Sequence, residues 1–143
     1  MQNKTQLDDT NILIVDDEAG IRDLFGMIVN AYLPNLHCDE AHDGAEAIER
    51  FKCGHHAVLL MDLHMPVLDG LASFERLCDV CRSDNHEMPA VIFCTGYAPP
   101  DSVMQIVRRD HRHCLLKKPV RAEVLLGAIR ERLPPHPPRL DAV

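Results

Sequence analysis

Tryptophan is absent from the 143-residue chain, and aromatic residues make up only 4% of it. Long apolar runs are absent too, because no stretch approaches the roughly 18 residues that a membrane-spanning helix needs. Residues 1–10 are polar and lack the apolar core of a signal peptide. The sequence therefore predicts a protein without a membrane span or an export signal, and we expect it in the cytoplasm.

Basic residues are outnumbered, since 15 lysines and arginines stand against 22 acidic residues and give a formal net charge of -7. A surface with this balance disfavours nucleic acid as a direct partner. Apolar residues make up 46% of the chain and charged residues 26%, as in ordinary globular proteins. The length suits one domain with its own core.

Six cysteines occur in a chain without an export signal, so reduced thiols are expected. Cys78 and Cys81 form a Cys-x-x-Cys motif inside a predicted helix. A redox thiol favours the start of a helix, where its pKa falls. A place in the core is therefore the favoured interpretation of Cys78.

Nine histidines are more than is usual for this length. His55-His56 and His111-Arg112-His113 resemble metal ligands, but adjacent histidines rarely form a site without partners at set spacing. We interpret both groups as histidines of surface loops.

Short apolar runs alternate with segments of helical periodicity along the chain. The runs predict buried strands at residues 11–15, 36–41, 57–61, 89–94 and 113–117. The periodic segments predict helices at residues 19–33, 43–54, 70–82, 100–109 and 121–133. The inward faces expected for the first and last helices are Ile21, Leu24, Phe25, Ile28 and Val29, and Val124, Leu125, Ala128 and Ile129. The alternation predicts an α/β fold in which helices cover both faces of a five-stranded parallel sheet.

The predicted domain covers residues 11–133. Residues 1–10 form a polar extension before it. Residues 134–143 begin with Pro134-Pro135-His136-Pro137-Pro138, which cannot continue a helix and predicts a stiff, extended tail.

Polar residues stand at the ends of four predicted strands. Asp16-Asp17 follows the first strand and Asp62 the third, while Thr95 and Lys118 follow the fourth and fifth. The carboxyl ends of parallel strands meet at one edge of a sheet, which is where α/β proteins bind their ligands. We therefore expect these side chains to converge.

Three converging carboxylates need a cation, because two negative charges at about 4 Å repel by about 4 kcal/mol at an effective dielectric of about 20. Oxygen ligands indicate Mg²⁺, with Mn²⁺ as the alternative. A lysine supplies a charge for a phosphate group, and Thr95 supplies a hydroxyl donor. Together these groups form the minimum apparatus for an aspartyl-phosphate.

Four motifs occur in an order and spacing that resemble a known family. They are Asp16-Asp17, the segment Asp-Leu-His-Met-Pro-Val-Leu-Asp-Gly at residues 62–70, Thr95-Gly96 and Lys118-Pro119. Over roughly residues 11–133 the chain resembles the receiver domain of response regulators, the CheY-like family of two-component signalling. The resemblance implies a flavodoxin-like, doubly wound (βα)5 fold with strand order 2-1-3-4-5.

The resemblance also implies roles for single residues. Asp62 would accept a phosphoryl group from the phosphohistidine of a histidine kinase or phosphotransfer protein. Asp17, Asp62 and the backbone carbonyl of His64 would bind Mg²⁺, and Asp16 would act through a metal-bound water. Lys118 would pair with Asp62 and then with the phosphoryl group.

Thr95 would bond the phosphoryl group and start a conformational change that an unknown protein target reads. Such a domain is not a conventional enzyme, although it catalyses its own phosphorylation and dephosphorylation. Receivers of this type often have a cis peptide bond before the proline that stands here as Pro119.

Four other residues affect the expected conformational switch and the expected lifetime of the phosphoryl group. Many receivers have an aromatic residue where Leu115 stands, so we predict a weaker or differently routed switch. His64 and Tyr97 are bulky and lack a group that would orient an attacking water, which predicts a long-lived phosphoryl group. Gly96 leaves the donor side open.

Three alternatives concern the function and the extent of the chain. A haloacid-dehalogenase-type phosphatase would need an aspartate two residues after Asp16, where Glu18 stands. A receiver-like protein-binding module that does not switch stays open, because of Leu115. Only the proline-rich tail follows Leu133, which fits either a stand-alone receiver or a receiver cut from a longer protein at its linker, and we expect the first.

Overall fold

Five parallel strands form one sheet in the computed structural model, which describes residues 3–134. The strands are β1 (Asp8–Val15), β2 (His37–Ala41), β3 (His56–Asp62), β4 (Ala90–Thr95) and β5 (Cys114–Lys117). The helices are α1 (Ala19–Tyr32), α2 (Gly44–Gly54), α3 (Gly70–Ser83), α4 (Asp101–Arg109) and α5 (Ala122–Arg132). The strand order β2-β1-β3-β4-β5 confirms the predicted fold.

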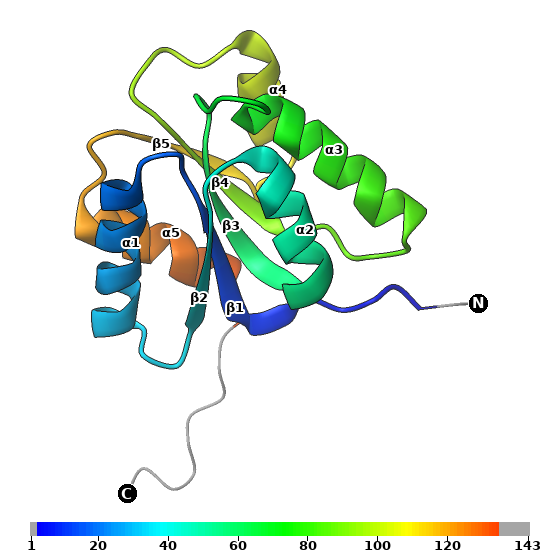
Figure 1. Ribbon diagram of the computed structural model, residues 1–143, viewed down its shortest axis with the longest axis horizontal. Helices are drawn as coiled ribbons and strands as arrows, with labels where there is room; N and C mark the ends of the chain where they lie inside the picture. Colours follow the sequence, from blue (N-terminus) through cyan, green and yellow to red (C-terminus); the bar gives the residue numbers. More distant parts are fainter. Residues whose placement is uncertain (1–2, 135–143) are drawn as a thin grey trace, which may run out of the picture.

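Helices cover both faces of the sheet, as Figure 1 shows, with α1 and α5 on one side and α2, α3 and α4 on the other. Side chains alternate along each strand, so one central strand serves two cores. Leu13 faces the core under α2, α3 and α4, while its neighbour Ile14 faces the core under α1 and α5. None of the described helices is long and apolar enough to cross a membrane.

The predicted elements agree with the structure to within one residue at each end, except at the start of β1. This strand begins at Asp8 rather than at residue 11, so the last three residues of the predicted extension belong to the sheet. Their side chains are exposed and polar, and the pairing is carried by the backbone. The N–H of Asp8 donates to the carbonyl of His55 at 2.7 Å.

The segment before β1 also contacts the loop between α3 and β4. Thr5 forms a parallel bridge with His86, in which its N–H donates to the carbonyl of Asn85 at 2.8 Å. The N–H of Glu87 donates back to the carbonyl of Thr5 at 3.0 Å. Beyond Pro134, the predicted tail lies outside the described residues.

The predicted inward faces of two helices were each one residue too wide. Leu24 is 47% exposed and Val124 is 46% exposed, whereas Phe25, Val29, Leu125 and Ile129 are buried. Each exposed residue directly precedes a buried one. Neighbouring residues of an α-helix point in directions about 100° apart around its axis, because the helix has 3.6 residues per turn. The sheet covers a narrower stripe than the apolar pattern indicates.

The surface interpretation of the histidines is wrong for His56 and His113, which are 0% and 3% exposed. His56 Nε2 lies 2.7 Å from Asp39 Oδ2, and His113 Nδ1 accepts the N–H of Val91 at 2.9 Å. His113 also packs edge-on against Phe74, with ring centroids 5.0 Å apart. In a chain poor in aromatic residues, imidazole rings take places in the core.

The Cys-x-x-Cys motif lies on the inner side of α3. Cys81 is buried, and Cys78 is half-buried with its Sγ 4.0 Å from the Sδ of Met88. Burial raises the pKa of both thiols, that of Cys81 to about 11. A thiolate is therefore disfavoured at both positions, which agrees with a packing role.

Candidate functional site

The two central strands bring three carboxylates together at the carboxyl edge of the sheet. Val15 pairs with Met61, so Asp16 and Asp62 leave the sheet at the same level. Carboxylate oxygens of Asp16, Asp17 and Asp62 lie within 4.8 Å of one another. Asp16 and Asp62 are buried, whereas Asp17 is exposed.

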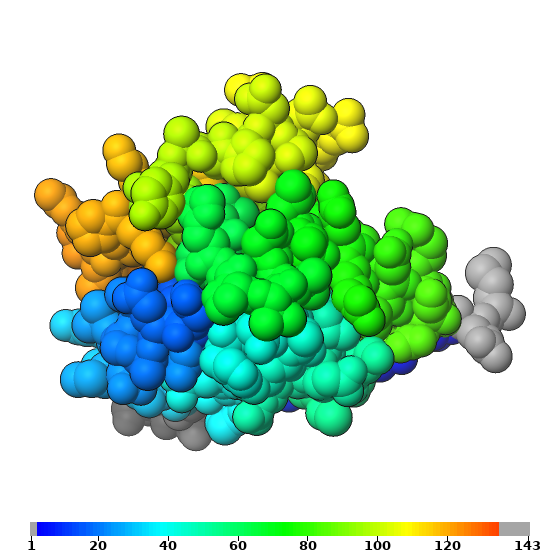
Figure 2. Space-filling view, turned by 45° about the horizontal axis from the view of Figure 1, so that its top comes forward, coloured from blue at the N-terminus to red at the C-terminus, as the bar shows by residue number. Residues whose placement is uncertain are grey.

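Four loops surround this edge. Figure 2 shows the segments that follow β1, β3, β4 and β5, in blue, green, yellow-green and orange, meeting on one face of the molecule. Residues from distant parts of the sequence therefore share one surface, as the strand ends predicted.

Among the described residues, Lys118 is the cation that pairs with the carboxylates of the site. Its Nζ lies 2.9 Å from Asp16 Oδ2 and 3.5 Å from Asp62 Oδ1. Burial lowers the pKa of Lys118, but the hydrogen bond to Asp16 and the charges of both carboxylates outweigh it and raise the pKa. The resemblance implied pairing with Asp62, and the structure adds the shorter contact with Asp16.

The backbone around Lys118 fixes its position. The N–H of Lys118 donates to the carbonyl of Thr95 at 2.8 Å, which ties the end of β5 to the end of β4. The peptide bond between Lys118 and Pro119 is cis, as the resemblance implied.

The surroundings of Asp62 raise the pKa of its carboxyl group. Burial raises its pKa, and the charge of Asp16 raises it further. The N–H of His64, which donates to Asp62 Oδ1 at 3.2 Å, and the charge of Lys118 act in the opposite direction and do not cancel the shift. Additional positive charge at this edge would therefore favour the ionised form of Asp62.

The loop between β3 and α3 is held close to the backbone of Asp62. Asp69 begins α3 by accepting the N–H of Ala72 at 2.8 Å. A side chain at Gly70 would place a Cβ 2.5 Å from the carbonyl oxygen of Asp62. Only glycine fits at this position without moving the backbone next to Asp62.

Thr95 is buried and bonded within its own loop. Its hydroxyl donates to the carbonyl of Tyr97 at 3.1 Å and accepts the N–H of Tyr97 at the same distance. Tyr97 is 72% exposed, and its ring meets the ring of His64 edge-on, with centroids 4.9 Å apart and planes at 83°. A Cβ added at Gly96 would meet nothing within 4 Å.

A hollow of about 330 Å³ lies beside this loop. It is lined by Thr95, Gly96, Tyr97, Ala98, Pro99, Leu115 and Lys117. Leu115 packs partly against the core on the α4 side of the sheet. The hollow is therefore bounded by the end of β4, the loop after it and β5.

The donor atoms of the carboxylate cluster fit a hard divalent cation. Asp16, Asp17 and Asp62 offer only oxygen, and no other set of three such ligands converges among residues 3–134. Oxygen donors suit Mg²⁺, which keeps several waters and takes one or two carboxylates. The exposed position of Asp17 leaves room for those waters.

One residue that sequence reasoning missed supports the cluster. Arg22 of α1 donates from its Nη1 to the carbonyl of Asp16 at 2.6 Å, and its Nε lies 3.7 Å from Oε1 of Glu40. An arginine six residues after an aspartate on an amphipathic helix gives no signal of this contact.

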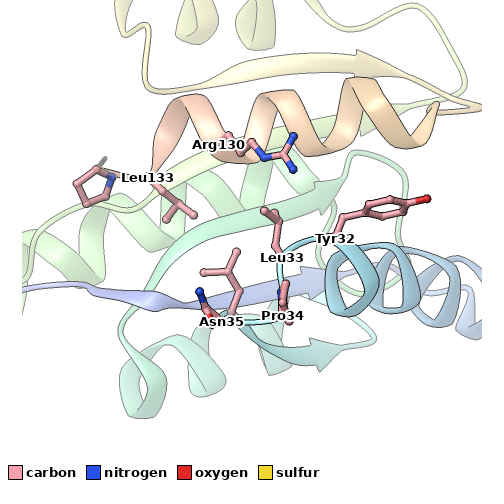
Figure 3. Close-up of a pocket in the computed structure, with 8 residues that line it drawn as sticks. Tyr32, Leu33, Pro34, Asn35, Arg130 and Leu133 are labelled. Carbon is pink, nitrogen blue, oxygen red and sulfur yellow. The ribbon is translucent and has the colours of Figure 1, made fainter. Parts of the chain in front are cut away.

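Another pocket, of about 300 Å³, lies at the opposite end of the sheet. Figure 3 shows Arg130 and Leu133 at the end of α5 facing the turn of Leu33, Pro34 and Asn35 after α1. Its lining is mostly apolar and holds no carboxylate. It is therefore separate from the carboxylate cluster.

A family model described as the response regulator receiver domain matches residues 12–130. The positive alginate biosynthesis regulatory protein of Pseudomonas aeruginosa is 33% identical over 135 residues, which cover 93% of this chain and 51% of that protein. The response regulator MprA of Mycobacterium avium is 29% identical over 133 residues, or 92% of this chain and 54% of that protein. The chain thus spans about half the length of these relatives.

Solved structures show the same fold. A receiver domain protein from Clostridium thermocellum aligns with a TM-score of 0.71 at 24% identity, covering 87% of this chain and 94% of that one. The chemotaxis protein CheY4 of Vibrio cholerae aligns with a TM-score of 0.70 at 22% identity, covering 90% and 100%. With the matched family model, these findings show that the chain belongs to the response regulator receiver domain family of two-component systems.

Proposed function

We propose that Asp62 accepts a phosphoryl group from the phosphohistidine of a histidine kinase or phosphotransfer protein, with Mg²⁺ as cofactor. The resulting change of surface would regulate a protein target. The observation that carries this proposal is the convergence of Asp16, Asp17 and Asp62 around the ammonium group of Lys118.

The chemistry is a transfer between two nucleophiles. A carboxylate oxygen of Asp62 attacks the phosphorus atom, a P–O bond forms, and the P–N bond to the donor imidazole breaks. Lys118, 3.5 Å from Asp62, would follow the new negative charge from the carboxylate to the phosphoryl oxygens. The buried hydroxyl of Thr95 would donate to another of those oxygens.

Asp17, Asp62 and the backbone carbonyl of His64 would hold the metal directly, and Asp16 would hold it through a water. The ion would supply positive charge to offset the carboxylates and the incoming phosphoryl oxygens. Because Asp62 has a raised pKa, a cation here also favours the charged nucleophile. Mn²⁺, with similar ligand preference, is the alternative metal.

The rim of the site would limit hydrolysis. His64 and Tyr97 lie edge-on to each other and offer no carboxylate or amide to orient water. Gly96 leaves the neighbouring approach open for a donor. We infer a phosphoryl group that persists long enough for a target to bind.

The proposal extends to the class of partner and to the cellular location of the protein. The net charge of -7 favours a protein partner over direct contact with nucleic acid or an anionic membrane. A histidine-kinase donor agrees with the cytoplasmic location that we expect from the sequence.

Intact-protein mass tests the chemistry directly. After incubation with acetyl phosphate and Mg²⁺, the chain should gain one phosphoryl group, and Asp62→Asn should gain none. Asp69→Asn is a matched control, because it alters an acid of the same loop while keeping a side chain that can cap α3. If the wild type gains nothing with Mg²⁺ or Mn²⁺, the chain is a receiver-like binding module.

A further inference from the structure

We infer that Tyr97 is the moving part of this receiver, and that its ring leaves His64 and enters the hollow beside Leu115 when Asp62 is phosphorylated. The inference rests on the proposed phosphorylation of Asp62. It assigns to Tyr97 a positioning role that depends on the hydroxyl of Thr95.

Thr95 holds Tyr97 in place in the structure described here. The two hydrogen bonds of 3.1 Å, one in each direction, close a small ring between the Thr95 hydroxyl and the Tyr97 backbone. A hydroxyl carries one proton and can donate to only one acceptor at a time. The contact with the Tyr97 carbonyl therefore excludes donation to any other group.

A phosphoryl group on Asp62 would compete for that proton. Asp62 pairs with Cys94 in the register of β3 and β4, and Thr95 is the next residue along β4. A hydrogen bond to a charged oxygen is roughly twice as strong as one to a neutral carbonyl. Donation should shift to the phosphoryl group, which breaks the bond to the Tyr97 carbonyl.

The released residue has space to move. Tyr97 already lines the 330 Å³ hollow, so its ring can enter by local rotation rather than by movement of the sheet. For comparison, an engineered apolar cavity of about 150 Å³ accepts benzene. Leu115 lines the same hollow and offers an apolar surface to the ring.

The neighbouring backbone permits the rotation, and burial favours it. Gly96 has no side chain, and nothing lies within 4 Å of where one would stand. Tyr97 is 72% exposed, and its ring meets the ring of His64 edge-on. Placing an apolar ring against Leu115 removes that surface from water. The exposed surface then changes on the β4–α4 loop and along β5.

The composition of the chain provides a specific probe. There is no tryptophan, and the two tyrosines are Tyr32 and Tyr97. Tyr32 lines the pocket at the opposite end of the sheet, so Tyr32→Phe leaves Tyr97 as the single tyrosine without touching the site. Acrylamide quenching of its fluorescence then reports the exposure of this ring.

The experiment compares Tyr32→Phe with Mg²⁺ alone and with Mg²⁺ plus beryllofluoride, a phosphoryl mimic. We expect the quenching constant of Tyr97 to fall to less than half when the mimic is bound. In Tyr32→Phe with Leu115→Phe, the added ring fills the hollow, so the constant should stay high. If the double variant does not fold, the single variant alone decides the question.

Intact mass with acetyl phosphate separates the two proposals. A Tyr32→Phe chain that gains a phosphoryl group while Tyr97 stays fully quenchable, with acetyl phosphate and with the mimic, overturns the inference and leaves the proposed function standing. A chain that gains no phosphoryl group removes the proposed function and the inference with it.

Discussion

Lys118 Nζ lies 2.9 Å from Asp16 Oδ2, and this side-chain hydrogen bond joins residues 102 positions apart in the sequence. The bond brings a lysine that precedes α5 to an aspartate that follows β1. The ammonium group of Lys118 therefore offsets the repulsion between the carboxylates of Asp16 and Asp62.

Lys118→Met should destabilise the fold when no divalent ion is present. Leaving the buried Asp16 carboxylate without its hydrogen-bond partner should lower the free energy of unfolding by about 2 kcal/mol. Mg²⁺ should restore much of the loss, because it supplies the missing charge. Urea unfolding in EDTA and in Mg²⁺ measures both effects. Lys117→Met, at an exposed neighbour, is the control, and equal stability of the two variants in EDTA would contradict the prediction.

Two glycine-to-alanine substitutions should change the free energy of unfolding in opposite directions. Gly70→Ala puts a Cβ 2.5 Å from the carbonyl oxygen of Asp62 and 2.8 Å from the Cα of Leu63, so we expect a loss of about 1–3 kcal/mol. Gly127→Ala, inside α5 with nothing within 4 Å, should gain about 0.5–1 kcal/mol from helix propensity. Denaturant midpoints measure both. The close contact at residue 70 is irrelevant to stability if its alanine variant matches wild type.

His113 should make stability depend on pH between 6.5 and 4. Burial lowers its pKa from 6.5 to about 4, so the unfolded chain binds a proton where the folded chain does not. Its contribution is complete above pH 6.5, decreases as pH falls toward 4, and amounts to about 3 kcal/mol at most. Unfolding free energies across this range measure it.

His113→Gln should flatten that pH slope, because it removes the titrating ring and keeps an acceptor for the N–H of Val91. His111→Gln, at an exposed position, should keep the wild-type slope. An unchanged slope in His113→Gln would assign the pH dependence to other groups.

His64 and Tyr97 should each favour a long-lived phosphoryl group, because neither side chain carries a carboxylate or amide that would orient an attacking water. In His64→Asn with Tyr97→Glu, an amide and a carboxylate could orient a water, and we expect the half-life to shorten several-fold. Decay of phosphorylated protein, followed by intact mass after acetyl phosphate is removed, measures it. Tyr97→Phe keeps the ring and should leave the half-life close to wild type. A double variant that decays at the wild-type rate would refute the role of the pair.

The sequence predicted the parts of the fold that depend on apolar burial. Each central strand reads as an unbroken apolar run because helices cover both of its faces, and such runs ended within one residue of the observed strands. Residues 8–10 were missed since they join the sheet through backbone bonds that polar side chains do not reveal. His56 and His113 were missed because their partners, Asp39 and the Val91 backbone, are distant in sequence.

Some features of the site were predictable from the sequence and others were not. The convergence of Asp16, Asp17 and Asp62 was predictable from the strand-end rule, which requires only strand order and direction. The preference of Lys118 for Asp16 depends on differences below an ångström, which no pattern encodes. The hydrogen bonds between Thr95 and Tyr97 depend on a loop conformation that the sequence leaves open.

β1 and β3, which end at Asp16 and Asp62, lie side by side in the middle of the sheet, and β3 is buried along its whole length. The carboxylates of the proposed phosphorylation site are thus attached to the buried middle of the sheet. Under the proposed function, the phosphoryl transfer takes place at the ends of buried strands, and the recognition of a partner takes place on the loops around them. Substitutions in the surface loops could change which partner is recognised across related receivers while the carboxylate geometry stays constant.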